Sequence, residues 1–223
     1  MLKFKILLFF LLLSIISIFK LKALDQLSSS TLLIDSSSNP LSKFSADWNK
    51  PNFKDCNTAV KEDYLSVEEK KIIWILNMAR RDPQLFLNSV ILNPTCDFYK
   101  EEKKRNNYDW SLIKKLKTLT SNPIILAPNH DAYLSAQCHA YYSGLKGYVG
   151  HKRIHSACKE DFLGECCQYG FEDALSIVLA LLLDYDVPSL GHREICLSTE
   201  YKSIGVAIEQ HKRYSYNTVL DFK

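Results

Sequence analysis

The sequence predicts an α+β fold, in which several helices are followed by two antiparallel strands at the C-terminus. Apolar residues recur at helical spacing from residue 67 onward, whereas residues 203–210 alternate between apolar and polar. A second segment rich in β-forming residues, 214–222, follows after the polar turn 211–213. The chain is long enough for one domain with a sizeable core and additional terminal segments.

The first 23 residues have the composition of a secretory signal peptide. Two lysines precede the apolar run 6–19, which is too short to span a bilayer comfortably, and Ala23 is a small residue at the cleavage position. Leu21 and Lys22 are not small, so an uncleaved signal anchor is the alternative. We therefore expect a secreted, extracellular protein that contacts a membrane only through this segment.

A linker and one domain are expected after the signal peptide. Residues 24–61 are rich in Ser, Asn and Pro and show no sustained periodicity, which predicts a flexible linker. Trp48 and Phe53 indicate that its end docks on the domain surface. The domain itself is expected to cover residues 62–223.

The charge of the mature chain argues against a nucleic-acid partner. Four of the 28 basic residues lie in the first 23, so 24 bases face 25 acids in the remainder. The formal charge thus changes from +3 to −1 when the signal peptide is removed. A near-neutral domain lacks the basic surface that nucleic-acid binding requires.

All seven cysteines lie after the signal peptide. In an oxidising compartment some of them should be bridged, and the odd number leaves one or three thiols as the expected count. No C-x-x-C pair is present, and the spacings do not match a zinc finger. The sequence does not determine which cysteines pair.

The first helices are marked by their N-terminal caps. Ser66 and Glu69 form a capping box in front of apolar positions that repeat at i, i+3, i+4 and i+7. A second helix is expected to begin at the Asp-Pro pair 82–83 and to end before the Asn-Pro pair 93–94. The charged residues 97–107 predict a solvated loop, and residues 112–119 predict a short helix.

The middle helix has one face of small residues. It follows the extended connector 123–128, and Asn129 or Asp131 is its expected N-cap. A small face lets another element approach closely, so we expect His139 to be a packed core histidine instead of a metal ligand. The residues on this face are Ala132, Ser135, Ala136, His139 and Ala140.

An apolar segment, 171–183, predicts a helix that is buried on several sides. Two acids, Asp184 and Asp186, follow it, and the Val-Pro pair 187–188 prevents the helix from continuing. Gly191 then places His192 in a turn. A histidine after a turn with carboxylates upstream is typical of a ligand or acid–base site, although an ordinary surface turn is the alternative.

Three short motifs place a functional side chain directly after a glycine. These motifs are Gly150-His151, Gly164-Glu165 and Gly191-His192. We expect all three to lie in loops, where converging functional side chains are commonly found.

The ordered set of motifs resembles the CAP superfamily of cysteine-rich secretory, antigen 5 and pathogenesis-related proteins, in its bacterial-type SCP branch. The resemblance covers residues 65–222. It rests on L-S-V-E-E-K-K-I-I-W-I-L-N-M-A-R-R-D-P, L-S-A-Q-C-H-A, G-E-C-C-Q-Y-G, L-L-L-D-Y-D-V-P-S-L-G-H-R, Y-K-S-I-G-V-A-I-E-Q-H and V-L-D-F.

The resemblance implies an α–β–α sandwich with a small antiparallel sheet between helical layers. It also implies a cleft with two histidines and two acids that can hold a divalent metal, often zinc. By motif, His151, His192 and Glu165 would belong to this cleft. Asp184 and Asp186 are the candidates for the second acid, and His155 is a possible substitute for His151.

Two functions are compatible with such a cleft, and the resemblance favours a secreted binding module for a sterol, another lipid or another extracellular protein. The alternative is a zinc-dependent hydrolase or protease, because nitrogen and oxygen ligands suit zinc and the ion can activate water. A thiol hydrolase using Cys166 or Cys167 with His151 or His192 is a third, disfavoured reading, since secreted cysteines are usually bonded or buried.

Overall fold

The structure, a computed structural model, describes residues 38–96 and 107–223. The predicted signal peptide, the linker up to residue 37 and most of the predicted charged loop lie outside these residues. Within the described part, residues Pro40–Lys223 form one compact unit. No helix of this part is both long and apolar enough to cross a membrane.

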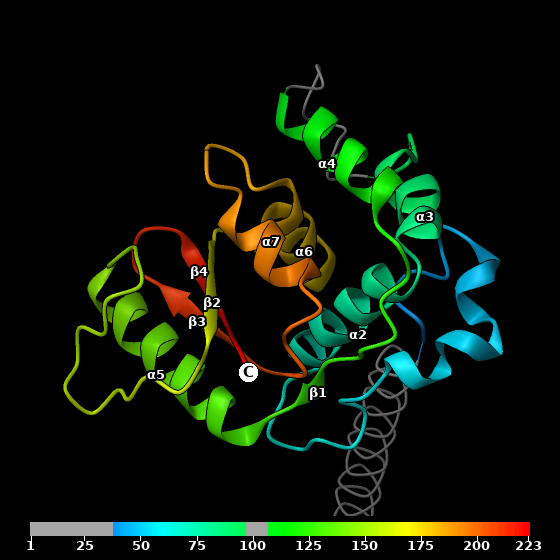
Figure 1. The fold of residues 1–223 in the computed structure, drawn as a ribbon. Coiled ribbons are helices and arrows are strands. Elements are labelled where there is room, and N and C mark those ends of the chain that lie inside the picture. The colour runs from blue at the N-terminus through cyan, green and yellow to red at the C-terminus, as the bar shows by residue number, and fades with distance from the viewer. Residues whose placement is uncertain (1–37, 97–106) are drawn as a thin grey trace, which may run out of the picture. The chain divides into compact units, whose positions relative to one another are not determined.

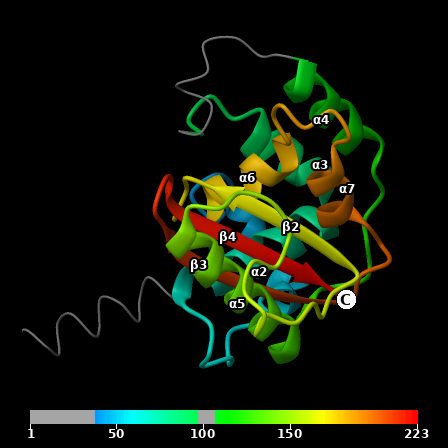
Figure 2. The ribbon, with the colours of Figure 1, turned by 90° about the vertical axis from the view of Figure 1, so that its left-hand side faces the viewer.

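The compact unit has three layers, with a sheet between helices (Figure 1). Helix α5 (His130–Lys146) covers one face of the sheet, and it lies in front of the strands in Figure 2. Helices α2 (Val67–Arg81), α6 (Ala174–Leu183) and α7 (Gly191–Leu197) lie on the other face. The predicted α+β sandwich is confirmed.

The sheet has four strands in the order β1-β3-β4-β2. Strands β3 (Ser203–His211) and β4 (Ser215–Phe222) form the predicted C-terminal hairpin, and β2 (Gly164–Tyr169) pairs antiparallel with β4. The two-residue strand β1 (Ala127–Pro128) is parallel to β3, so the sheet is mixed and not wholly antiparallel as expected. Strand β2 lies at one edge, where the candidate site is found.

The helix signals in the sequence correspond to observed caps. Ser66 and Glu69 form both hydrogen bonds of the capping box at the start of α2. Helix α6 begins three residues later than expected, because the Asp173 side chain accepts a hydrogen bond from the Ser176 N–H and thereby caps it. The remaining helices are α3 (Pro83–Phe86), the π-helical turn η3 (Leu87–Ile91) and α4 (Asn107–Thr118).

The predicted linker extends too far toward the C-terminus. Residues from Pro40 onward belong to the compact unit and include two short 3₁₀ helices, η1 (Ala46–Asn49) and η2 (Pro51–Cys56). Trp48 is fully buried, contacts the rings of Phe53 and Phe86 in tilted and edge-on geometry, and donates a hydrogen bond to Ser89. Single short turns have no periodicity, which is why the pattern of the sequence did not reveal them.

One disulfide is present among the described cysteines and joins Cys138 in α5 to Cys158. The expectation that some cysteines are bridged is therefore confirmed. The structure differs from the expected one or three thiols, because five other cysteines have thiol side chains. These are Cys56, Cys96, Cys166, Cys167 and Cys196.

Candidate functional site

The candidate site lies around the edge strand β2. Of the three glycine motifs expected in loops, only Gly150-His151 is in one. Glu165 is instead the second residue of β2, and His192 lies in the first turn of α7. These two predictions were wrong because a glycine before a polar residue marks a backbone position without specifying whether a loop, strand or helix follows.

The first half of the site is a hydrogen-bonded pair of His151 and Glu165. The Nδ1 of His151 donates to Oε1 of Glu165 at 2.8 Å, and Arg153 contacts the other carboxylate oxygen. This hydrogen bond raises the pKa of His151 above its ordinary value. Burial raises the pKa of Glu165, but the hydrogen bond from His151 and the charge of Arg153 outweigh it, so that its pKa is lowered.

The second half is an equivalent pair between His192 and Asp184. The Nδ1 of His192 donates to Oδ1 of Asp184 at 2.7 Å, and the backbone N–H of Arg193 donates to Oδ2 at 3.2 Å. Asp184 is the C-cap of α6 and has a left-handed backbone, with φ of 56°. This conformation turns its side chain from the end of one helix toward the start of the next.

The other candidates from the sequence do not join these pairs. Asp186 is exposed, three residues beyond the end of α6. The His155 ring stacks on Tyr142 with ring centroids 3.7 Å apart. Of the two candidate acids, Asp184 contacts His192, and of the two candidate histidines, His151 contacts Glu165.

The two histidine–carboxylate pairs face each other across the edge of the sheet. The ring centroids of His151 and His192 are 6.2 Å apart, at an interplanar angle of 33°. The side chain of His151 is 57% exposed and that of His192 is 20% exposed. In the neutral ring, donation of the Nδ1–H to a carboxylate leaves the lone pair on Nε2. A carboxylate that orients an imidazole in this way is the usual support of a metal-binding histidine.

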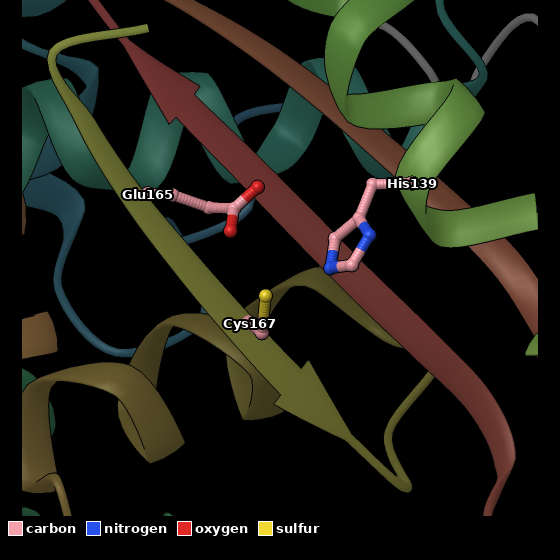
Figure 3. Close-up of side chains that lie close together, drawn as sticks. All are labelled: His139, Glu165 and Cys167. Atoms are coloured by element: carbon pink, nitrogen blue, oxygen red, sulfur yellow. The ribbon is translucent and has the colours of Figure 1, made fainter. Parts of the chain in front are cut away.

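A second group of potential ligands lies deeper, between β2 and α5. One ligand atom from each of His139, Glu165 and Cys167 lies within 4.8 Å of the others, so this buried group could hold a metal ion. Figure 3 shows Glu165 and Cys167 projecting from β2 toward His139. The sequence predicts His139 as a core residue and gives no indication that Cys167 is a ligand. Glu165 and Cys167 could have been recognised as neighbours from the sequence, because side chains alternate between the two faces of a strand and residues 165 and 167 therefore lie on the same face of β2.

The inner group is less open to an ion than the outer histidines are. The Nε2 of His139 donates to the carbonyl of Gly150 at 2.9 Å, and its Nδ1 is buried without a hydrogen-bond partner. Glu165 is already paired with His151 and Arg153. A metal ion here would have to replace those interactions inside a buried layer.

The thiol of Cys167 is not arranged as a nucleophile. Its Sγ lies 3.7 Å from Nδ1 of His151, but that nitrogen is already bonded to Glu165. Burial raises the pKa of Cys167 well above its ordinary value, with the charge of Glu165 adding to the effect. The neutral thiol is a poor nucleophile, so the geometry does not support a thiol hydrolase.

Behind Glu165, a buried acid shares the same arginine. Asp221 on β4 is opposite Glu165 in the strand register, accepts a hydrogen bond from Ser135 at 2.6 Å and lies 3.3 Å from Arg153. Burial is the largest cause that raises the pKa of Asp221 to about 8, and the neighbouring charge of Glu165 adds to it. The folded protein therefore keeps this carboxyl protonated at pH values where an unfolded chain has lost the proton.

We expect this acid to make stability fall as the pH rises. Between its ordinary pKa of 3.8 and about 8, the unfolded state binds fewer protons than the folded state, so each step upward favours unfolding. An Asp221→Asn variant mimics the protonated acid and should lose this dependence. Urea unfolding should show its stability, relative to the wild type, improving by at least about 1.4 kcal/mol between pH 4 and pH 8. A relative stability that is the same at both pH values would contradict the prediction.

Two surface cavities lie away from the histidines. One, of about 540 Å³, is lined by Glu68, Gly170, Phe171, Glu172, Asp173, Ser215 and Tyr216. The other, of about 420 Å³, is lined by Lys115, Leu119, Glu194, Ile195, Leu197, Ser198, Thr199, Glu200 and Tyr201. Both linings contain several charged side chains, which do not suit a sterol or another apolar ligand.

Comparison of the chain with models of protein families, with curated proteins and with solved structures gave no match.

Proposed function

We propose that this protein is a secreted, CAP-like binding module that holds a divalent metal ion, such as zinc, between His151 and His192. The observation that carries this proposal is the pair of histidine–carboxylate hydrogen bonds facing each other at a ring separation of 6.2 Å. A zinc ion lies about 2 Å from each coordinating nitrogen, and a separation of 6.2 Å between the ring centroids is compatible with one ion between the rings.

Export from the cytosol is the second part of the proposal. The Cys138–Cys158 disulfide is typical of an oxidising compartment. The N-terminal segment, with lysines before a short apolar run, has the composition of a signal peptide. Both observations support a protein that acts outside the cytosol.

A binding role is favoured over hydrolysis by the position of the carboxylates. A zinc hydrolase needs a water on the ion and a base that can take its proton. Glu165 and Asp184 both contact the Nδ1 side of their histidines, opposite the nitrogens that would bind the ion. They can orient the ligands but do not face a water on the ion. The zinc-dependent hydrolase therefore remains the second candidate.

A protein partner is favoured over a sterol or lipid. The two surface cavities described above are lined in part by charged residues, among them Glu68, Glu172 and Asp173 in the larger one. A sterol site requires a mostly apolar lining with few polar groups. A polar surface close to a metal-ordered cleft suits an extracellular protein better.

Calorimetry with zinc at neutral pH tests the metal site. We expect the wild type to bind one ion and His192→Ala to lose binding by at least about 100-fold, because one of two imidazole ligands is removed. Asp184→Asn should weaken binding by about 10- to 100-fold, which is the usual effect of losing the group that orients a ligand. Binding should also weaken in acid, because protonated imidazoles cannot bind a metal.

Variants of two residues outside the outer histidine pair, one from the inner group and one remote from it, provide the matched control. Cys167→Ser and His155→Ala should both leave zinc affinity unchanged, since neither side chain belongs to the outer pair. Loss of zinc binding in Cys167→Ser together with normal zinc binding in His192→Ala would show that the ion binds at the inner group. This result would overturn the proposed site. Zinc-dependent hydrolysis of peptide or ester substrates, abolished in His192→Ala, would favour the hydrolase instead.

A further inference from the structure

Two adjacent cysteines on β2 have different environments. Cys167 faces α5 together with Ala136 and Ala140, whereas Cys166 lies in the main core on the opposite face of the sheet. Cys196, on α7, belongs to the same core, and both Cys166 and Cys196 are fully buried. Alternation along the strand thus directs Cys166 toward the layer that contains α7.

The structure places the thiols of Cys166 and Cys196 next to each other. The Cys196 side chain is close enough to Cys166 to add to the rise in the pKa of its thiol, of which burial is the largest cause. Independently, Sγ of Cys166 lies 3.7 Å from the backbone oxygen of His192, which is four residues before Cys196 and therefore on the same side of α7. A Cβ atom added at Gly164, two residues before Cys166, would lie 3.3 Å from Cγ2 of Ile195 on α7. Strand β2 and α7 therefore pack closely at the level of the two cysteines.

We propose that Cys166 and Cys196 form a second disulfide, which ties β2 to α7 beneath the histidine cleft. The Cys138–Cys158 bond shows that the fold is compatible with an environment in which disulfides form. With this bond, the number of thiols falls from five to three, at Cys56, Cys96 and Cys167. This link is independent of whether the cleft binds a metal.

The bond would form by thiol–disulfide exchange with a donor disulfide, either oxidised glutathione or a disulfide-bonded oxidoreductase. One protein thiolate attacks a sulfur of the donor and gives a mixed disulfide, and the second thiolate then displaces the remaining donor sulfur. The protein loses two electrons and two thiol protons. The donor takes both and becomes two thiols.

The exchange must take place before the core closes. Burial raises the pKa of Cys166 well above its ordinary value, and both sulfurs are inaccessible in the folded protein. Thiols in this state react slowly, because the thiolate is the attacking species. The link therefore belongs to folding in an oxidising compartment, and the mature protein should resist mild reduction at this bond.

The disulfide would connect the two halves of the candidate site. Glu165 precedes Cys166 on β2, and His192 lies one turn before Cys196 on α7. A bond between the two cysteines therefore fixes the distance between the strand that supports His151 and the helix that carries His192. The cleft geometry would then depend less on the packing of α7 alone.

Disulfide mapping of the full chain, expressed with export to an oxidising compartment, tests the proposal. The protein is alkylated under denaturing, non-reducing conditions, digested and analysed by mass spectrometry. We expect a cross-linked peptide pair that contains Cys166 and Cys196, beside the pair that contains Cys138 and Cys158. The wild type alone suffices for this measurement, so it does not depend on the folding of a variant.

Two variants sharpen the result. Cys196→Ala should make Cys166 available for alkylation after denaturation, whereas the control Cys56→Ala should leave the Cys166–Cys196 peptide pair intact. Loss of the bond should lower the midpoint of thermal unfolding by roughly 6 to 12 °C. Alkylated Cys166 and Cys196 in the exported wild type, or either cysteine linked to another partner, would overturn the proposal.

Discussion

Replacing Gly205 by alanine is expected to destabilise the protein by more than about 3 kcal/mol, or to prevent folding. Gly205 lies in β3 where α5 crosses it, and a Cβ atom there would be 2.0 Å from the backbone N of Tyr133 and 2.1 Å from the carbonyl C of Ala132. These are backbone atoms of a helix, so the clash can be relieved only if α5 moves off the sheet. Urea unfolding, or the yield of folded protein, measures the effect.

A glycine elsewhere in the fold provides the control. An added Cβ at Gly191 would meet only Oγ of Ser189, at 3.4 Å, which is an ordinary contact. Gly191→Ala should therefore change the stability by less than about 1 kcal/mol. Equal effects of the two substitutions would show that α5 and β3 do not pack as closely as the structure shows. Such a result would also argue against the explanation that the small residues on α5 are needed for its close approach to β3.

Replacing Arg193 by alanine is expected to lower the free energy of unfolding by about 3 to 5 kcal/mol. The guanidinium is 1% exposed, and it donates to the carbonyls of Leu182 and Leu183 at 2.6 and 2.7 Å. It also donates to Ser111 at 2.8 Å, which connects α4 to the end of α6. Without it, the last carbonyls of α6 would be buried with fewer hydrogen-bond donors, which is costly in a dry core.

Two further arginine variants separate charge from geometry. Arg193→Lys keeps the charge but loses the planar set of donors, so we expect it to recover less than half of the lost stability. Arg213→Ala, at the exposed turn between β3 and β4, should change the stability by less than about 0.5 kcal/mol. Urea denaturation at neutral pH measures all three. A full recovery by lysine would indicate that charge alone matters at this position.

The local elements of the fold could be predicted from the sequence, because each is encoded within a few neighbouring residues. The capping box of Ser66 and Glu69 marks the start of α2, and the alternation after residue 203 marks β3. The small face of α5 predicted a close neighbour, and Gly205 of β3 is that neighbour. The sequence also points to the residues that come together at the candidate site, His151, Glu165 and His192, but it does not determine their secondary structure.

The tertiary structure alone decided how these residues are combined. Asp184 and Asp186 are equivalent in the sequence, but the left-handed C-cap of α6 directs only Asp184 to His192. The sequence left the pairing of the cysteines open, and the structure joins Cys138 to Cys158. Packing also brought residues from Pro40 onward into the compact unit. The physical reason is the same in each case. These contacts join residues that are far apart in the sequence and meet only when the helices and the sheet pack together, so no short sequence pattern marks them.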